Sequence, residues 1–213
     1  MMLTENGLRL SKSELAALLA FSATDPASPY YGVHFKSSVP DDSGGDPLVK
    51  ARSTDGNVAV DAFGHSNLDR DREWFVSRAF LTGLSKLADS THTVLLQFQG
   101  ASLHHAAVES AAGQEVASFS WPGSGAASGQ ISFADSAEWD RRLKLPSRSR
   151  GVKCLTMKTG SLRLLAKLGA AAGVASVECY PPPQDDERLL VRAEGDDTTW
   201  IAMVDPAIAT DAD

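Results

Sequence analysis

The chain repeats one pattern, a short helix followed by three strands, and this repeat limits its fold more than any other feature. In the first copy, residues 11–21 place apolar side chains at helical spacing, with Ser11 or Ser13 as the expected N-cap. Three expected strands follow, at residues 31–37, 48–53 and 57–62. The run Asp55-Gly56-Asn57 is a strong hairpin signal between the last two strands.

The pattern returns twice more along the chain. The second copy predicts a strand, a helix and three strands, at residues 73–76, 79–87, 93–99, 102–108 and 115–121. The last copy predicts the same order, at residues 152–157, 160–168, 174–180, 189–194 and 199–204. Residues 130–151, which precede the last copy, hold one strand pattern at 131–133 and a capped stretch around 137–143. A complete unit does not fit there, so one repeat unit is abbreviated.

The strand patterns predict an α+β protein with antiparallel sheets and a few short helices. Within residues 93–99, Val94, Leu96 and Phe98 alternate with polar residues, which gives the strand one buried and one wet face. A Gly/Ser-rich segment at residues 122–129 has the composition of an interdomain linker. We therefore expect two domains, at residues 1–121 and 130–213.

Charge is distributed unevenly along the chain, whose formal net charge is −7. Residues 1–138 carry 9 basic and 16 acidic residues, and residues 168–213 carry 2 basic and 10 acidic residues. Residues 139–167 carry 9 basic residues against Asp140 alone, a net charge of +8. Such a cluster in an acidic protein indicates either a surface that attracts phosphate or a solvated basic face.

The sequence has no arrangement typical of an enzyme or a metal site. His104 and His105 fall on opposite faces of one expected strand, and the other three histidines have no ligand spacing. The sequence also lacks phosphate-binding loops, dinucleotide-binding loops and nucleophile elbows. We therefore expect no catalysis, no metal and no cofactor.

Several features predict a cytoplasmic protein. The first residues lack the basic and apolar regions of a signal peptide, and no apolar run approaches the roughly 20 residues that cross a membrane. Cys154 and Cys179 fit a reducing compartment, where we expect two small buried residues instead of a disulfide or a metal pair.

Four segments, in this order, resemble the DNA sliding clamps, the family of the β subunit of bacterial replicative polymerase and of proliferating cell nuclear antigen. Residues 7–10 precede the first helix as the opening strand of a clamp does, and residues 54–60 are similar to the clamp hairpin. Residues 76–81 resemble the strand-to-helix step of the second clamp unit, and residues 200–206 resemble the terminal strand. The resemblance covers most of the chain and rests on the order of the elements.

The resemblance implies a ring that encircles duplex DNA without sequence specificity, with helices around the central hole. Weak contacts to phosphates would come from basic residues on the helices and in the abbreviated unit. These candidates are Lys12, Arg78, Lys86, Arg141, Arg142, Arg148, Arg150, Arg163 and Lys167. Two domains per chain would make the ring a homotrimer.

The resemblance also implies a hydrophobic groove for short peptides of DNA polymerases, clamp loaders and repair proteins. Motif by motif, it assigns to this groove Asn57, Val58, Trp121, Pro122, Met203, Val204 and Pro206. Val58, Trp121 and Met203 fit the cores of their strands equally well. The abbreviated unit leaves a second hypothesis open, a clamp-like adaptor or inhibitor that binds proteins without encircling DNA.

Overall fold

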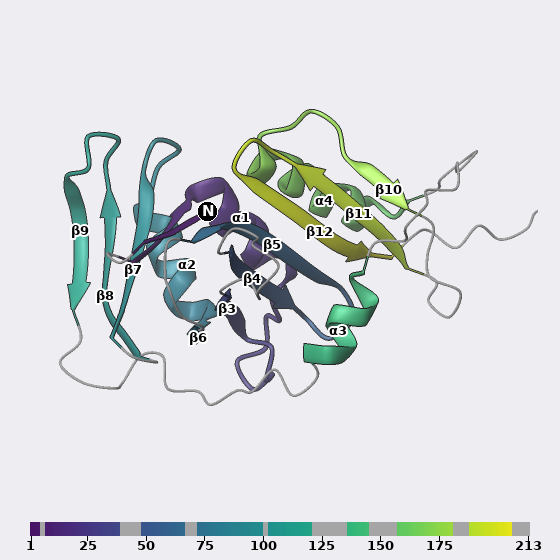
Figure 1. Cartoon of the computed structure of the whole chain (residues 1–213), viewed down its shortest axis with the longest axis horizontal. Helices are drawn as coiled ribbons and strands as arrows, with labels where there is room; N and C mark the ends of the chain where they lie inside the picture. The colour runs from purple at the N-terminus through teal and green to yellow at the C-terminus, as the bar shows by residue number, and fades with distance from the viewer. Residues whose placement is uncertain are drawn as a thin grey trace, which may run out of the picture.

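The computed structural model describes residues 1–4, 7–38, 48–66, 72–99, 102–120, 136–144, 157–180 and 188–205 (Figure 1). The strand patterns at residues 131–133 and 152–156 lie outside this part, as does the expected linker at residues 122–129.

Within the described residues, the first two units form with the predicted order of helix and strands, preceded by a short additional strand, β1 (Met2–Thr4). The first unit comprises β1 (Met2–Thr4), β2 (Gly7–Ser11), α1 (Lys12–Phe21), β3 (Gly32–Ser38), β4 (Leu48–Thr54) and β5 (Ala59–Ser66). The second comprises β6 (Arg72–Ser77), α2 (Arg78–Leu87), β7 (Thr93–Gln99), β8 (Ser102–Glu109) and β9 (Glu115–Ser120). After these come α3 (Ser136–Arg142), α4 (Thr159–Ala172), β10 (Glu178–Tyr180), β11 (Leu189–Glu194) and β12 (Thr198–Val204).

Helix α1 begins at Lys12 because Ser11 caps it. The Ser11 hydroxyl accepts a hydrogen bond from the Glu14 amide (3.2 Å), and the Glu14 carboxylate accepts one from the Ser11 amide (2.7 Å). This reciprocal pair is a capping box. Of the two caps that the sequence leaves open, Ser11 is the one used.

Helix α4 is longer than predicted. It runs to Ala172, past the expected end at residue 168, and stops at Gly173, which has a φ of 72°. This left-handed conformation suits glycine and ends the helix. The next strand, β10, therefore starts at Glu178 and not at residue 174.

The units exchange strands and so build one continuous sheet. Strand β2 of the first unit pairs with β7 of the second, and β6 of the second unit pairs with β3 of the first. Strand β12 joins the last unit to β5, with Met203 opposite Ala59. All pairings are antiparallel except a short parallel contact of β1 with β5. The predicted α+β fold with antiparallel sheet is confirmed.

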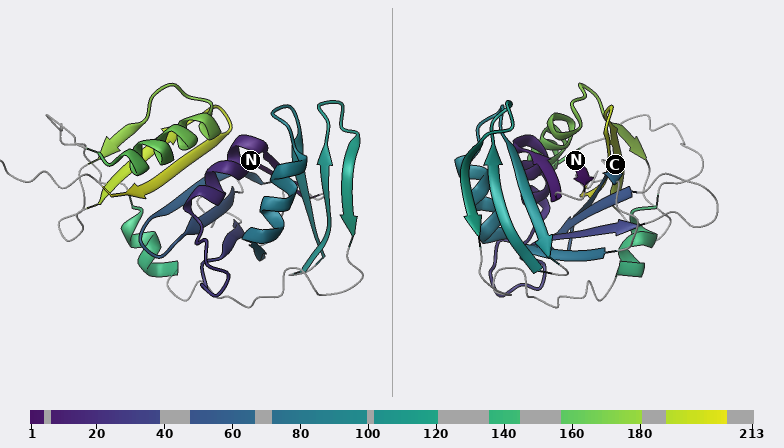
Figure 2. Two further views of the ribbon diagram at one scale, coloured as in Figure 1. Left: turned by 180° about the vertical axis from the view of Figure 1, so that it is seen from behind. Right: turned by 60° about the vertical axis from the view of Figure 1, so that its left-hand side comes forward.

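The sheet has two different faces. Helices α1, α2 and α4 cover one of them, which we call the helix-side face, and α3 lies on the opposite, outer face (Figure 2). Side chains alternate accordingly along β5: Val60 and Ala62 belong to the core under the helices, whereas Ala59 packs with residues of the outer face. Helix α1 packs between α2 and α4, so it is apolar around most of its circumference.

Candidate nucleic-acid and partner-binding surfaces

The exposed charges of helices α2 and α4 are all positive. Lys86 on α2 and Arg163 and Lys167 on α4 are exposed, and none of the three has a partner among the described residues. Neither helix contains Asp or Glu, and the acidic residue of α1, Glu14, is only 5% exposed. The helix layer therefore presents to solvent a surface that attracts phosphate.

Two other predicted DNA contacts are engaged within the fold. The Arg78 guanidinium donates to the carbonyl oxygens of Leu19 and Ser22 at the end of α1, the latter at 2.9 Å. The Lys12 ammonium donates to the Ala88 carbonyl, just after α2, at 2.6 Å. Both side chains are half-buried, and their charges stabilise the carbonyl-bearing ends of α1 and α2.

Two further predicted DNA contacts, Arg141 and Arg142, do not share the helix-side face. Arg141 and Arg142 lie on α3, on the outer face, and the Arg142 guanidinium lies 5.2 Å from the centre of the Trp139 ring. Arg148 and Arg150 lie outside the described residues. The fold thus divides the basic segment 139–167 between two faces, and DNA contact by these four arginines stays a prediction.

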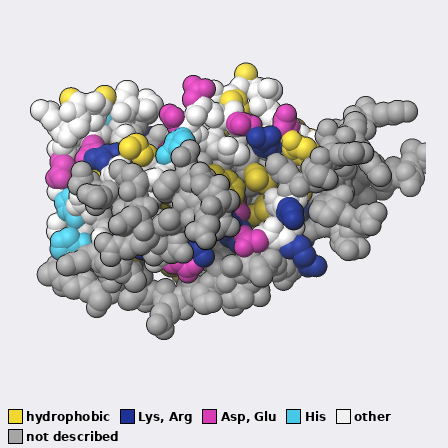
Figure 3. Space-filling view, viewed as in Figure 1, with side chains coloured by type: hydrophobic (Ala, Val, Ile, Leu, Met, Phe, Trp, Pro, Cys, Tyr) yellow, Lys and Arg dark blue, Asp and Glu magenta, His cyan; other side chains and the backbone are white. Residues whose placement is uncertain are grey.

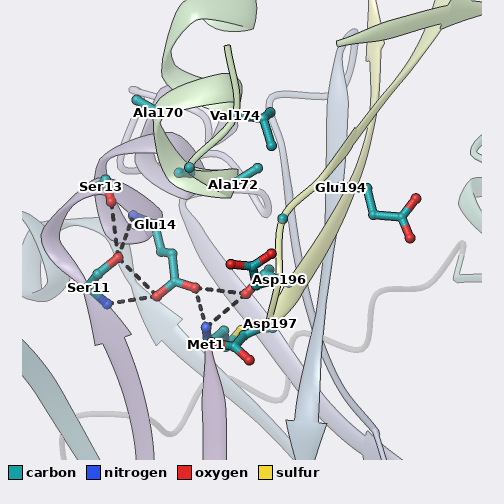
Figure 4. Close-up of a pocket in the computed structure, with 14 residues that line it drawn as sticks. Met1, Ser11, Ser13, Glu14, Ala170, Ala172, Val174, Glu194, Asp196 and Asp197 are labelled. Carbon is teal, nitrogen blue, oxygen red and sulfur yellow. Dashed lines mark hydrogen bonds and ion pairs between the residues drawn. The ribbon is translucent and has the colours of Figure 1, made fainter. Parts of the chain in front are cut away.

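An acidic hollow lies at one end of the helix layer (Figure 4). It measures about 470 Å³ and is bordered by the first turn of α1, the last turn of α4 and the turn between β11 and β12. Glu14 there binds the amino group of Met1, and Asp196 and Asp197 are exposed. The exposed carboxylates of Glu194, Asp196 and Asp197 make this end of the layer acidic, so it repels phosphate.

The outer face carries an apolar patch that α3 covers. Trp139 of α3 and Leu143, just after it, are 4% and 3% exposed because they pack on this patch. The patch, which we call the outer patch, consists of Ala59, Phe75, Leu190 and Met203, with Tyr180 and Ile201 at its border. The patch spans the pairing of β5 with β12, where the first and last units meet. Figure 3 looks onto this face of the molecule.

A glycine makes room for one member of the outer patch. A Cβ atom at Gly32 would lie 2.4 Å from the ring of Phe75, which packs over β3 from the neighbouring strand β6. The same Cβ would lie 2.4 Å from the Val76 carbonyl oxygen, so a larger residue at position 32 would have to move strand β6 as well as the Phe75 ring.

Four charged residues connect α3 to the sheet beside the patch. Arg52 on β4 lies opposite Asp61 on β5, and each is only 2% exposed. The Arg52 guanidinium donates to both Asp61 carboxylate oxygens at 2.6 Å. It also donates to Asp140 Oδ1 of α3 at 2.5 Å, and Lys50 Nζ donates to the same oxygen at 2.6 Å. We call these residues the outer ion cluster.

The outer ion cluster keeps Asp140 ionised. Partial burial raises the pKa of Asp140, but hydrogen bonds and charges from Lys50 and Arg52 outweigh this effect, so the pKa lies below its ordinary value. A cleft of about 220 Å³ adjoins Asp140 and is lined also by His34. Burial lowers the pKa of His34, and the charge of Glu73 opposes this shift only in part.

The predicted groove residues separate in the structure. Met203 is fully buried in the outer patch, against the α3 residues, whereas Val204 is buried in the core on the helix side. Val58 packs against that same core. Asn57 is exposed, and its carbonyl accepts a hydrogen bond from Arg188. Trp121, Pro122 and Pro206 lie outside the described residues.

Trp139, Asp140 and Arg52 form one surface that the sequence patterns above do not predict. A signal was present, because β4 and β5 each carry one buried charge, Arg52 and Asp61, beside buried apolar residues. Buried charges are rare without a partner, so opposite charges on neighbouring strands predict a pair.

Some features are not found in the part of the chain that the structure describes. No three His, Cys, Asp or Glu side chains gather there as a metal ion would require. No helix in this part is long and apolar enough to cross a membrane. Cys179 is a half-buried thiol whose pKa is raised by burial, and it packs against the core on the helix side.

Comparison with known proteins identifies the fold. The β subunit of DNA polymerase III from Pseudomonas aeruginosa superposes with a TM-score of 0.53 at 14% sequence identity, over 94% of this chain and 66% of that chain. The corresponding subunit of Thermotoga maritima gives 0.51 at 10% identity, over 97% and 65% of the two chains. The Helicobacter pylori beta clamp gives 0.51 at 10% identity, over 93% and 65%.

The chain therefore has a sliding-clamp-like fold, as the sequence resemblance predicts. It spans slightly less than two thirds of the length of the clamps named above. No protein-family model and no curated protein matches its sequence.

Proposed function

We propose that this protein is a clamp-like platform on duplex DNA that recruits replication or repair proteins and performs no chemistry of its own. The observation that carries this proposal is the charge of the helix layer. The exposed charges of α2 and α4 are Lys86, Arg163 and Lys167, without an acidic residue on either helix. Three cations without a partner among the described residues give a weak, sequence-independent attraction to phosphates, which is what a protein needs in order to slide on DNA.

The acidic hollow limits where DNA can lie. Asp196 and Asp197 border the C-terminal end of α4, whereas Arg163 lies in the first half of that helix. Phosphates approaching the helix layer are repelled at one end and attracted along the rest. In our proposal the duplex passes over the exposed faces of α2 and α4, and Arg78 and Lys12 act on it only indirectly, by holding the helix ends.

We further propose that protein partners bind at the outer patch, on the other face of the sheet. The resemblance places a peptide groove near Met203, and Met203 is a member of this patch. A DNA polymerase, a clamp loader or a repair protein would then contact the protein without obstructing DNA. Because such partners work on DNA, this proposal places the protein in the cytoplasm.

A charge reversal on each face tests the DNA contact. We expect Arg163→Glu/Lys167→Glu to weaken binding of a fluorescein-labelled duplex and to reduce the slope of log affinity against log salt by about 2, because each lost phosphate contact removes about 0.9. The matched control is Arg141→Glu/Lys144→Glu, which reverses two exposed charges in and just after α3 and should leave the slope unchanged. If only the control variant lowers the slope, DNA binds the outer face. If neither variant changes the slope, the proposed DNA contact is wrong.

The oligomeric state distinguishes the proposed ring from the alternative, a clamp-like adaptor that does not encircle DNA. Among the described residues, strands β9 and β10 each pair with one strand only, and β9 exposes Val116 (56%), so we infer that these two edges receive the second copy. Head-to-tail pairing through them would build a ring, with a homotrimer as the expected size. The repeat unit that is abbreviated in the sequence, at residues 130–151, favours instead an adaptor that binds partners without encircling DNA. Light scattering distinguishes the two hypotheses, because a protein that is strictly monomeric at micromolar concentration cannot form the ring.

A further inference from the structure

The outer patch is apolar, whereas the rest of the outer face is largely charged. Elsewhere the outer face of these strands carries charged side chains such as Lys36, Glu73 and Arg192, two of them in ion pairs with each other. At the patch, the strands instead carry fully buried apolar side chains, among them Leu190 and Met203. Their burial depends on the segment formed by residues 136–144, which we call the α3 segment.

The α3 segment binds this patch as a short peptide ligand would. Its two apolar anchors, Trp139 and Leu143, are four residues apart and so lie on one side of the helix. Between them, Asp140 accepts hydrogen bonds from Lys50 and Arg52 at the rim of the patch. One aromatic anchor, one aliphatic anchor and one charge pair give a complete recognition pattern.

The α3 helix has little stability of its own. It spans Ser136–Arg142, and isolated helices shorter than about 12 residues are marginal in water. Its anchors pack on the patch, and the side chain of Asp140 remains 52% exposed although it is bonded. The helix therefore depends on the patch, whereas the sheet beneath has its own core on the helix side.

We propose that the α3 segment is a built-in ligand that occupies the outer patch in competition with a helical segment of a partner protein. This inference rests on the partner site of the proposed function and adds the chemistry of the partner. The partner segment carries an aromatic residue, a carboxylate at the next position and an aliphatic residue four positions after the aromatic one. Binding of the partner displaces the α3 segment, so the free protein presents a closed site.

The charges around the patch favour an acidic partner segment. Lys50 and Arg52 face the position of the Asp140 carboxylate, and Asp61 offsets only one of these two positive charges. In the adjoining cleft Lys36 pairs with Glu73, so a net positive charge remains beside the patch. A basic residue in place of the carboxylate would meet two cations and be excluded.

A peptide of this chain's own residues 136–144 is the direct test. It is titrated to millimolar concentration into the full-length protein, and NMR signals of the Met203 and Leu190 methyl groups report binding at the patch. In the unchanged protein the tethered α3 segment outcompetes the free peptide, because a tethered ligand has a high effective concentration. In Asp140→Lys, whose new charge faces Lys50 and Arg52, we expect the peptide to bind at least about tenfold more tightly.

Three controls fix the meaning of the result. Arg141→Glu, an exposed change in the same helix, should bind the peptide no better than the unchanged protein. A peptide with lysine in place of its aspartate should bind Asp140→Lys at least about tenfold more weakly. Trp139→Ala/Leu143→Ala releases the α3 segment by a second route and should also increase peptide binding.

Equal binding to the unchanged protein and to both released variants would overturn the proposal, and so would no binding to any of them. The result is independent of DNA. Loss of the DNA response to Arg163→Glu/Lys167→Glu would refute the DNA contact and leave the built-in ligand standing, whereas failed peptide binding with an intact DNA response would refute only the built-in ligand.

Discussion

The two faces of the sheet use positive charge in different ways. On the helix-side face, Arg163 and Lys167 are exposed and have no partner among the described residues. On the outer face, Arg52 is buried between Asp61 and Asp140 and holds the fold together. The difference lies in the acidic residues nearby. Helices α2 and α4 contain none, whereas β5 and α3 each contribute one carboxylate that binds Arg52. A cluster of basic residues in a sequence therefore predicts a phosphate-binding surface only where the fold leaves it without acids.

The largest expected effect is the loss of the buried pair on the outer face. Asp61→Ala leaves the Arg52 guanidinium buried with one partner fewer, and removing one member of a buried ion pair costs about 3 kcal/mol. Glu73→Ala is the matched control, because Glu73 pairs with Lys36 at 3.0 Å but is 57% exposed, and an exposed pair contributes at most about 1 kcal/mol. Urea denaturation measures both free energies of unfolding. Equal losses in the two variants would show that burial does not distinguish the pairs.

Much of the local structure is predictable from the sequence. The cap of α1 and the hairpin at Gly56 follow from residues within three positions of each other, such as the Asp55 carboxylate that accepts a hydrogen bond from the Asn57 amide at 2.8 Å. The positions of most strands along the chain follow from apolar stretches bounded by turn residues. The domain boundary at residues 122–129 lies outside the described residues and stays a prediction.

The faces themselves could not be predicted. Residues 139–167 read as one basic cluster, but α3 packs on the outer face and α4 on the helix-side face. The choice of face for α3 depends on a patch assembled from four strands, including Ala59 and Leu190, which are far apart in the sequence. Similarly, Arg78 has the position of a DNA contact in the helix pattern, and only the fold brings it to the end of α1.

The second prediction compares identical substitutions in the two apolar layers. Leu84 of α2 and Leu143 after α3 are 1% and 3% exposed. Leu84→Ala leaves a cavity in the main core and should cost about 3 kcal/mol. Leu143→Ala should cost only about 1 kcal/mol, because the α3 segment can detach and the rest of the protein stays folded. Urea midpoints compare the two variants, and an equal cost would mean that α3 unfolds together with the main core.

The smallest expected effect is a pH dependence confined to the outer face. Burial, with the charges of Arg52 and Lys36, lowers the pKa of His34 below its ordinary value of 6.5, although Glu73 partly opposes this. Below pH 6.5, His34 therefore binds a proton in the unfolded chain while it is still neutral in the folded protein. Stability conferred by neutral His34 is complete above pH 6.5 and is lost as the pH falls toward the lowered value.

This dependence can be isolated by comparing two histidines. Each unit of pKa difference corresponds to about 1.4 kcal/mol, so the free energy of unfolding should fall by an amount of that order or less between pH 8 and pH 5. His34→Gln should remove most of this slope, since glutamine cannot be protonated in this range. His104→Gln changes an exposed histidine on β8 and should retain the slope. A slope that survives His34→Gln would assign the pH dependence to another group and leave His34 as a neutral neighbour of the outer ion cluster.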